Sequence, residues 1–171
     1  MRNIVLTGFM GTGKTEVGRE LAKLRGLRLI DLDSEIEQSE KMTIGEIFKR
    51  FGEQKFRELE SEMVEKISRE QNVVISTGGG TVLRQQNMEA LKNTGTVVCL
   101  TASPETILER TGSSDDRPLL LVDNPLEKIR ELLQFRMPFY EKANLMIDTE
   151  DKTPLRIAEE IIEKIQNSQD E

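Results

Sequence analysis

The fold is decided by the stretch Gly8-Phe9-Met10-Gly11-Thr12-Gly13-Lys14-Thr15. It matches the pattern G-x-x-x-x-G-K-[ST], in which glycines let backbone N–H groups turn inward around an anion. The helix expected after it directs its positive end at the same place, Lys14 can reach the outer phosphates, and the Thr15 hydroxyl can ligate Mg²⁺. The motif predicts a phosphate-binding loop (P-loop) for a nucleoside triphosphate, but it does not say what happens to that nucleotide.

Short apolar segments alternate with amphipathic ones along the rest of the chain. We expect strands at 4–7, 29–32, 73–76, 96–100 and 145–147, with helical patterns between them. Short apolar strands separated by helices are typical of a parallel sheet that is covered on both faces. The sequence therefore predicts an α/β fold, and a length of 171 residues suits one domain over 1–171. This context disfavours the alternative for the motif, a glycine-rich turn without a ligand.

The composition excludes several functional classes. The net charge of −7 argues against non-specific binding to nucleic acid or anionic membranes. The absence of histidine excludes histidine bases, triads and zinc ligands. The one cysteine, Cys99, lies in an expected strand, where we interpret it as buried and unreactive. No apolar run approaches the roughly 20 residues of a membrane span, so we expect a cytoplasmic protein.

Two carboxylates lie at the end of the second expected strand. Asp31 and Asp33 are two residues apart, and residues at i and i+2 of a strand point the same way. Both side chains would face a cleft above the carboxyl ends of the strands, where α/β proteins bind ligands. One could help to hold Mg²⁺, and the other could accept a proton from a substrate hydroxyl or orient it. The pair alone leaves an alternative open: one of them, notably Asp33, merely caps the next helix.

A helical pattern contains Arg57 and Glu60, which are i, i+3 neighbours and can pair. The pair is either an ordinary surface salt bridge or a device in which Glu60 holds the fork of Arg57 for a carboxylate. Three glycines, Gly78-Gly79-Gly80, come after the third strand. Ordering three consecutive glycines costs much conformational entropy, so their lack of side chains must serve a purpose. The purpose is either the close approach of a ligand or a tight turn between strand and helix, and we favour the ligand.

Two further arginines are candidates for binding an anion. Arg136 precedes Met137-Pro138, so we expect it at a helix end that the proline breaks. Arg117 lies in a segment rich in glycine, aspartate and proline, which predicts a mobile loop. Both could also be ordinary surface arginines.

Taken in order, these segments resemble the shikimate kinases over the whole chain. The matching segments are Gly8–Thr15, Asp31–Asp33, Ile44–Phe48, Phe51–Glu53, Phe56-Arg57 with Glu60, Gly78–Gly80, Arg117–Leu120 and Arg136–Tyr140. The resemblance implies a P-loop fold like the nucleoside monophosphate kinases: a three-layer α/β/α domain with five parallel strands in the order 2-3-1-4-5. It also implies a mobile lid at about 112–124 and a substrate-binding helical segment at about 33–60. The implied activity is transfer of the ATP γ-phosphate to the 3-hydroxyl of shikimate, a step of aromatic amino-acid biosynthesis.

The resemblance also assigns residues to the donor side. ATP would contact the P-loop and flanking residues, which are Gly11, Thr12, Gly13, Lys14, Thr15, Arg110, Arg117 and Pro154. Lys14 would hold the β- and γ-phosphates, and Arg117 would swing in with the lid. Thr15 would ligate Mg²⁺ with Asp31 nearby. Arg110 and Pro154 would flank the adenine. The chain has Thr15-Glu16 where Ser-Thr is more frequent, but the hydroxyl is retained.

On the acceptor side, the resemblance implies that Asp33 contacts the ring hydroxyls and acts as the base. Arg57 and Arg136 would grip the shikimate carboxylate. The backbone of Gly79 and Gly80 would contact the substrate, and Phe48 and Phe56 would line its pocket. We expect a monomer whose partners are ATP and shikimate.

Two alternatives stay open at this point. A kinase for another small acceptor, such as gluconate or a nucleoside monophosphate, would share the P-loop and the lid but not the acceptor residues. A nucleotide-dependent switch would have no acceptor, and the N-K-x-D motif of guanine-binding switches is absent from the sequence.

Overall fold

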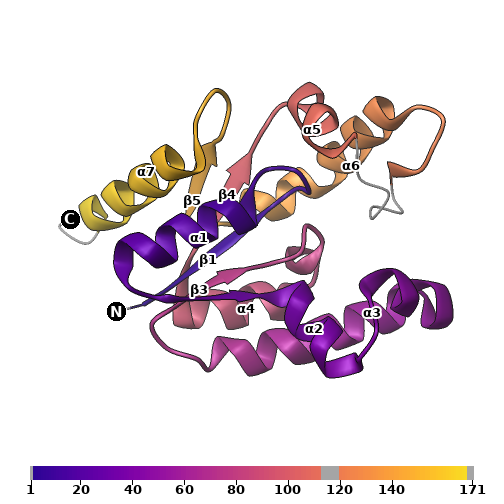
Figure 1. Cartoon of the computed structure of the whole chain (residues 1–171), viewed down its shortest axis with the longest axis horizontal. Coiled ribbons are helices and arrows are strands. Elements are labelled where there is room, and N and C mark those ends of the chain that lie inside the picture. The colour runs from indigo at the N-terminus through magenta and orange to yellow at the C-terminus, as the bar shows by residue number, and fades with distance from the viewer. Residues whose placement is uncertain (1, 113–119, 169–171) are drawn as a thin grey trace.

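The structure, a computed structural model, describes residues 2–112 and 120–168. In it five parallel strands form one sheet in the order β2-β3-β1-β4-β5 (Figure 1). The strands are β1 (Asn3–Gly8), β2 (Arg28–Asp31), β3 (Val73–Ser76), β4 (Gly95–Thr101) and β5 (Leu145–Asp148). The predicted strand order and parallel sheet are confirmed.

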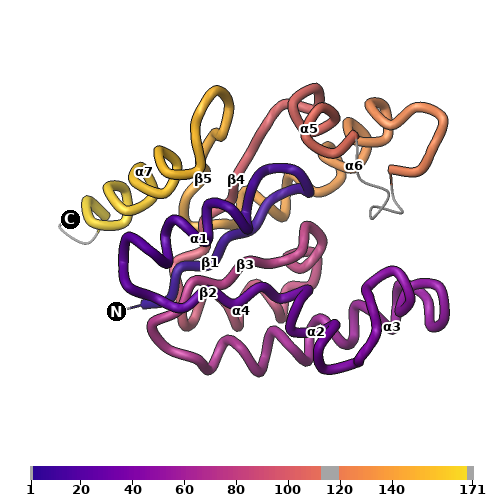
Figure 2. The backbone as a smooth tube through the Cα atoms, in the orientation of Figure 1, coloured from indigo at the N-terminus to yellow at the C-terminus, as the bar shows by residue number. Residues whose placement is uncertain are grey.

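Helices cover both faces of the sheet, which gives three layers. They are α1 (Lys14–Arg25), α2 (Leu32–Glu40), α3 (Ile44–Ser68), α4 (Gln85–Thr94), α5 (Pro104–Thr111), α6 (Pro125–Tyr140), α7 (Pro154–Asn167) and the short 3₁₀ helix η1 (Thr81–Leu83). Helices α1 and α7 lie side by side on one face. Helices α3, α4, α5 and α6 contribute buried residues to the core on the other face. Figure 2 shows α2 and the first half of α3 on the side of the molecule opposite the two chain ends.

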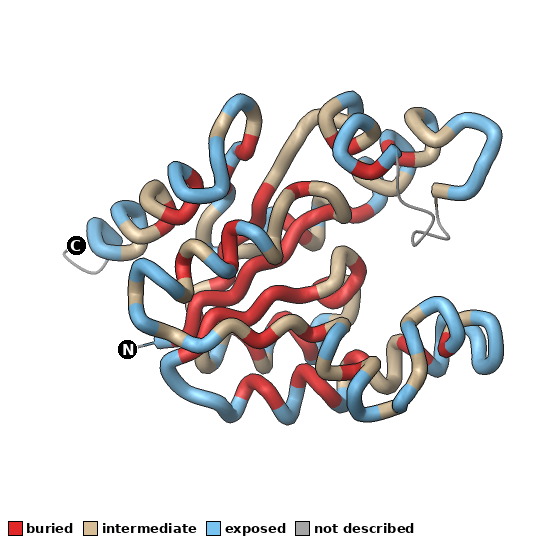
Figure 3. The backbone as a smooth tube through the Cα atoms, in the orientation of Figure 1, coloured by how far each residue is buried: buried red, intermediate tan, exposed pale blue. Residues whose placement is uncertain are grey.

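The core follows from the alternation of side chains along buried strands. In β1, Val5 packs with the cluster beneath α3 to α6, whereas Leu6 packs with α1 and α7. Successive residues of a strand face opposite sides, so a strand that is apolar throughout serves two cores. Figure 3 shows the resulting band of buried residues along the strands. Cys99 lies fully buried in β4, and this burial raises the pKa of its thiol to about 12.

Several helix ends carry the expected caps. The Thr153 hydroxyl accepts a hydrogen bond from Arg156 N at 3.2 Å, and Pro154 occupies the first turn of α7, as the sequence predicts. At the start of α3, Thr43 and Glu46 form a reciprocal capping box.

The prediction that Asp33 lies on the second strand is wrong. Strand β2 ends at Asp31, and α2 already begins at Leu32, so Asp33 lies in the first helical turn. The cap is also reversed: Asp31, not Asp33, accepts the hydrogen bond from Ser34 N, at 3.1 Å. Because Asp31 caps α2, the strand ends one residue earlier than the apolar pattern suggests, at Asp31 rather than at Leu32.

Helix α3 is two helices joined at Gly52. This glycine has φ 81° and ψ 172°, a region of backbone conformation that is almost confined to glycine. The first half precedes Gly52, and the second half carries Phe56, Arg57 and Glu60.

Helix α6 does not end at the proline, contrary to expectation. It continues through Pro138 to Tyr140, so Arg136 lies within its last turns. The expected lid at 112–124 contains Arg117, which lies outside the described residues. None of the described helices is long and apolar enough to cross a membrane.

Candidate active site

A cleft of about 730 Å³ opens at the carboxyl ends of the strands. Its volume is in the range of small-molecule sites. Apart from Arg117, every residue that the sequence assigned to the site lines this cleft: Gly11, Thr12, Gly13, Lys14, Thr15, Asp31, Asp33, Phe48, Phe56, Arg57, Gly79, Gly80, Arg110, Arg136 and Pro154. The structure thus brings these residues together, and their individual roles stay predictions.

The P-loop lies at the floor of the cleft, between β1 and α1. Gly8, Gly11 and Gly13 have positive φ angles, which turn the backbone around the future phosphate position. Lys14 Nζ donates to the carbonyl oxygens of Gly8 and Phe9, both at 2.9 Å. These contacts fold the lysine over its own loop, where its ammonium faces the same concavity as the start of α1.

The Thr15 hydroxyl donates to Asp31 Oδ2 at 3.1 Å. A hydroxyl from the P-loop helix and a carboxylate from the end of β2 therefore form one oxygen-rich point beside the phosphate loop. Within residues 2–112 and 120–168, no group of three acidic, cysteine or histidine side chains forms a metal cage. Mg²⁺ commonly takes only one or two protein ligands and completes its shell with phosphates and water, so this donor set fits Mg²⁺.

Asp33 is largely enclosed in the cleft. Its Oδ1 is buried and has no hydrogen-bond partner among the described residues. Burial, together with the nearby carboxylates of Glu60 and Asp31, raises the pKa of Asp33 to about 6, although Lys14 opposes the shift. An ionisable group that is buried, unpartnered and shifted in this way is typical of a functional position.

Arg57 is held by carboxylates. Its Nη1 donates to Glu60 Oε1 at 2.9 Å, and its Nη2 lies 3.4 Å from Glu53 Oε1. The Glu60 side chain is 1% exposed and also accepts from the Thr81 hydroxyl at 2.7 Å. Of the two interpretations of the Arg57–Glu60 pair, the buried geometry favours the one in which Glu60 positions the arginine fork.

Arg136 is held differently. The residue is 4% exposed, its Nε has no hydrogen-bond partner within the described chain, and its guanidinium carbon lies 5.4 Å from the centre of the Phe9 ring. One turn later on the same helix, the Tyr140 hydroxyl donates to Gly79 O at 2.7 Å. Burial raises the pKa of Tyr140 to about 12, so it remains a neutral donor.

Two of the three glycines, Gly79 and Gly80, allow arginines to approach the backbone. A Cβ atom at Gly80 would lie 2.5 Å from Arg57 Nη2, and one at Gly79 would lie 3.2 Å from Arg136 Nη1. The Gly79 backbone also packs against the P-loop, where a Cβ would lie 3.4 Å from Met10 N. The bare backbone thus has a reason that the sequence did not suggest: it is needed by protein side chains that line the cleft.

Two aromatic rings, those of Phe48 and Phe56, form a wall that lines part of the cleft. The rings of Phe48 and Phe56 pack with their centres 4.8 Å apart, and Arg57 lies 5.1 Å from the centre of the Phe56 ring. These two rings come from the two halves of α3, so the turn at Gly52 brings them together.

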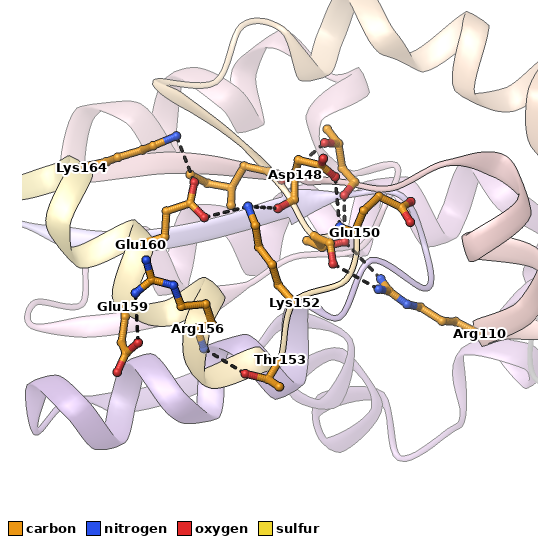
Figure 4. A network of polar contacts seen from close by, with 12 residues as sticks. Arg110, Asp148, Glu150, Lys152, Thr153, Arg156, Glu159, Glu160 and Lys164 are labelled. Atoms are coloured by element: carbon orange, nitrogen blue, oxygen red, sulfur yellow. Dashed lines mark hydrogen bonds and ion pairs between the residues drawn. The ribbon is translucent and has the colours of Figure 1, made fainter.

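The opposite end of the cleft is formed by α5 and the loop before α7. Arg110 Nη1 donates to Thr149 Oγ1 at 3.1 Å and to Gly11 O at 3.3 Å, which ties α5 to both this loop and the P-loop. Figure 4 shows the neighbouring network, in which Lys152 donates to Asp148 O at 2.9 Å and pairs with Glu160 at 2.8 Å. Pro154 follows directly and lines the same end of the cleft.

Sequence reasoning gave no role to Lys152, which lines the cleft, or to Phe9, Thr81 and Tyr140, which contact residues that line it. A signal existed for Tyr140, since it is four residues after Arg136 and so shares its helix face. Lys152 is two residues before Pro154, and its position beside that residue is the signal that could have found it. Nothing in the local pattern marks Phe9, which occupies an unspecified position of the motif, or Thr81.

Comparisons with known proteins agree with this architecture. The family model described as shikimate kinase matches residues 10–166. A shikimate kinase of Thermodesulfovibrio yellowstonii is 53% identical over 164 residues, which is 96% of this chain and 95% of that protein. The structure of shikimate kinase from Acinetobacter baumannii in complex with shikimate is 40% identical with a TM-score of 0.95, covering 98% of this chain and 94% of that one. The enzyme from Aquifex aeolicus gives a TM-score of 0.87 at 35% identity, covering 98% of both chains. This chain therefore belongs to the shikimate kinase family.

Proposed function

We propose that this chain transfers the γ-phosphoryl group of ATP to the 3-hydroxyl of shikimate, giving shikimate 3-phosphate and ADP. The observation that carries the proposal is the content of one cleft: a P-loop, a buried aspartate and two arginines positioned for an anion. The similarity to shikimate kinases over nearly the full length supports shikimate as the acceptor.

On the donor side, the P-loop backbone and Lys14 would bind the β- and γ-phosphates. Thr15 and Asp31 would hold Mg²⁺, which supplies positive charge to the phosphate oxygens when it is bound. Arg110 and Pro154 would flank the adenine, since they line the cleft at the end formed by α5 and α7. Phosphoryl transfer depends on positioning and charge stabilisation, so a site without histidine or a reactive cysteine suffices.

On the acceptor side, Arg57 and Arg136 would bind the shikimate carboxylate. The two guanidinium groups lie against adjacent glycines, Gly80 and Gly79, so they present their donors to one small region. Charge-assisted hydrogen bonds from two forks would fix both the position and the orientation of a planar carboxylate. Phe48 and Phe56 would pack against the ring of the acceptor.

Asp33 would act on the acceptor hydroxyl. Its pKa of about 6 leaves it ionised at neutral pH, yet more basic than an ordinary aspartate. The hydroxyl oxygen attacks the γ-phosphorus while the bond to the ADP oxygen breaks, and the hydroxyl proton passes to the Asp33 carboxylate. The buried Oδ1 has no hydrogen-bond partner among the described residues and would be available for this contact.

This activity places the protein in aromatic amino-acid biosynthesis. We infer that it works in the cytoplasm as a monomeric single domain, with no nucleic-acid or membrane partner. The net charge of −7 supports the last point, because polyanions and anionic membranes would repel such a surface.

A coupled assay of ADP release tests the proposal. Purified protein with ATP and Mg²⁺ would be given shikimate, gluconate and nucleoside monophosphates in turn. We expect saturable ADP release when the acceptor is shikimate and none when it is gluconate or a nucleoside monophosphate. Turnover with another acceptor but not with shikimate would overturn the proposal, and so would ATP binding without turnover of any acceptor.

A further inference from the structure

Phe9 occupies a position that the P-loop motif leaves unspecified. Its side chain is 1% exposed and belongs to the core cluster beneath α3 to α6, and it also lies against Arg136, with 5.4 Å between the guanidinium carbon and the ring centre. A residue of the nucleotide loop therefore contacts the arginine that is proposed to bind the acceptor.

Within the described part of the chain, the side chain of Arg136 contacts the Phe9 ring and the Tyr140 hydroxyl. No aspartate or glutamate within the described part of the chain forms an ion pair with it, and its buried Nε has no hydrogen-bond partner there. A carboxylate beside Arg136 would compete with an anionic acceptor for the guanidinium. The negative face of an aromatic ring stabilises the cation without occupying its hydrogen-bond donors.

Two further residues, Gly79 after β3 and Tyr140 on α6, lie beside Arg136. Gly79 packs between Arg136 Nη1 and the P-loop backbone, and its carbonyl oxygen is held by Tyr140. The backbone carbonyl of Phe9 accepts from Lys14 Nζ at 2.9 Å and from the Thr12 hydroxyl at 2.7 Å. Phe9 thus contacts Arg136, on the proposed acceptor side, through its ring, and Lys14, on the nucleotide side, through its carbonyl oxygen.

We propose that Phe9 is a positioning residue, whose ring seats the guanidinium of Arg136 and keeps its donors available for the carboxylate of the acceptor. The inference rests on the proposed function for the identity of that acceptor. Leucine at this position would fill similar space but would offer no negative face to the cation. The P-loop would then build part of both substrate sites.

Fluorinated phenylalanines at position 9 test the proposal most cleanly. Successive fluorine atoms weaken the negative face of the ring while changing its volume little, so a role in packing alone would respond weakly. The same substitutions at Phe135, which is exposed on the same helix as Arg136, serve as the control. Binding of shikimate and of ATP would be measured by calorimetry for each protein.

We expect shikimate affinity to fall stepwise with fluorination at position 9, by about 2- to 30-fold in total, the range of a cation–π contact. ATP affinity and the Phe135 series should stay constant. Shikimate affinity that does not change along the position-9 series would overturn the proposal. If the unmodified protein neither binds nor phosphorylates shikimate, the proposed function fails instead.

A double-mutant cycle keeps the Phe9–Arg136 contact testable in that case. Phe9→Leu and Arg136→Met would be made singly and together, and thermal unfolding would be followed without substrates. Phe9→Leu should lower Tm more in the presence of Arg136 than in the Arg136→Met background. If Phe9→Leu lowers Tm equally in the two backgrounds, the Phe9 ring does not stabilise the guanidinium of Arg136.

Discussion

Arg57 and Arg136 line the same cleft, but the protein holds their guanidinium groups in opposite ways. Arg57 is paired with two carboxylates, one of which, Glu60, is itself buried and held by Thr81. Arg136 is nearly buried on α6 and rests on the Phe9 ring, without an ion pair to any described carboxylate. The first arrangement is an internal salt bridge that a ligand can extend. The second is a buried cation whose carboxylate partner, in the proposed function, is supplied by the acceptor.

In the proposed function, both arginines bind the acceptor and Asp33 takes part in the chemical step. Asp33→Asn should therefore lower kcat by about 100- to 10,000-fold, since it removes the group that accepts the hydroxyl proton. The KM for ATP should change little. The variant should also unfold at a higher temperature, because a neutral amide replaces a buried carboxylate near Glu60 and Asp31. Steady-state kinetics and thermal melts check both points, and near-normal kcat would remove Asp33 as the base.

Replacing the two arginines should have clearly different effects on the stability of the protein. Arg57→Met leaves the buried carboxylate of Glu60 without its partner, and we expect a loss of about 3 kcal/mol in the free energy of unfolding. Arg136→Met removes a buried cation that has no described carboxylate partner, so stability should be unchanged or higher. Urea unfolding of the two variants measures the difference. Equal losses would mean that the two arginines are held alike.

In contrast, both arginines should contribute to acceptor binding. Each methionine variant that folds should weaken shikimate binding by about 1.5–3 kcal/mol, the contribution of a hydrogen bond to a charged group, and leave ATP binding intact. Calorimetry with each ligand tests this. If shikimate affinity is unchanged in both variants, the pair does not grip the carboxylate.

The smallest expected effect concerns the turn that aligns Arg57 with the aromatic wall. Gly52→Ala forces a side chain into a backbone region that is almost confined to glycine, at a cost of about 1–3 kcal/mol. No atom beyond its chain neighbours lies within 4 Å of the added Cβ, so the effect comes from the backbone. It should also raise the KM for shikimate, because Phe48 moves relative to Phe56.

Gly26→Ala is the matched control for Gly52→Ala. Gly26 caps α1 with φ 63° and ψ 34°, and an added Cβ would again meet no atom within 4 Å. It lies outside the cleft, so we expect a loss of stability of about 1 kcal/mol without a change in the KM for shikimate. An equal rise in KM in both variants would show that Gly52 acts only through stability.

The sequence predicted the parallel sheet and the location of most of the site because each rests on a local pattern. The P-loop is a contiguous motif that can be recognised directly in the sequence. Short apolar segments indicate strands of a sheet that is buried on both faces. The end of β2 was placed too late because Leu32 is apolar and suits either a strand or a buried helix, and the cap by Asp31 decides between them. Pro138 was taken to end α6, whereas the helix tolerates it and continues to Tyr140.

Contacts between segments that are far apart in the chain could not be predicted from the sequence. Phe9 and Arg136 are far apart in the chain, and their approach depends on how α6 packs across the sheet. The glycines after β3 were interpreted through ligands and turns, but their Cβ positions are excluded by arginines from α3 and α6. Such reasons depend on tertiary packing, which no local pattern records.

The most direct test of the central claim compares shikimate with its methyl ester as acceptors for the unmodified protein. The ester keeps the reacting hydroxyl and removes the negative charge that Arg57 and Arg136 are proposed to bind. Initial rates of ADP release would be measured over a range of each acceptor with saturating ATP and Mg²⁺. The account predicts efficient turnover of shikimate and a kcat/KM for the ester that is about 100-fold lower. Equal kcat/KM values for the two acceptors would contradict it.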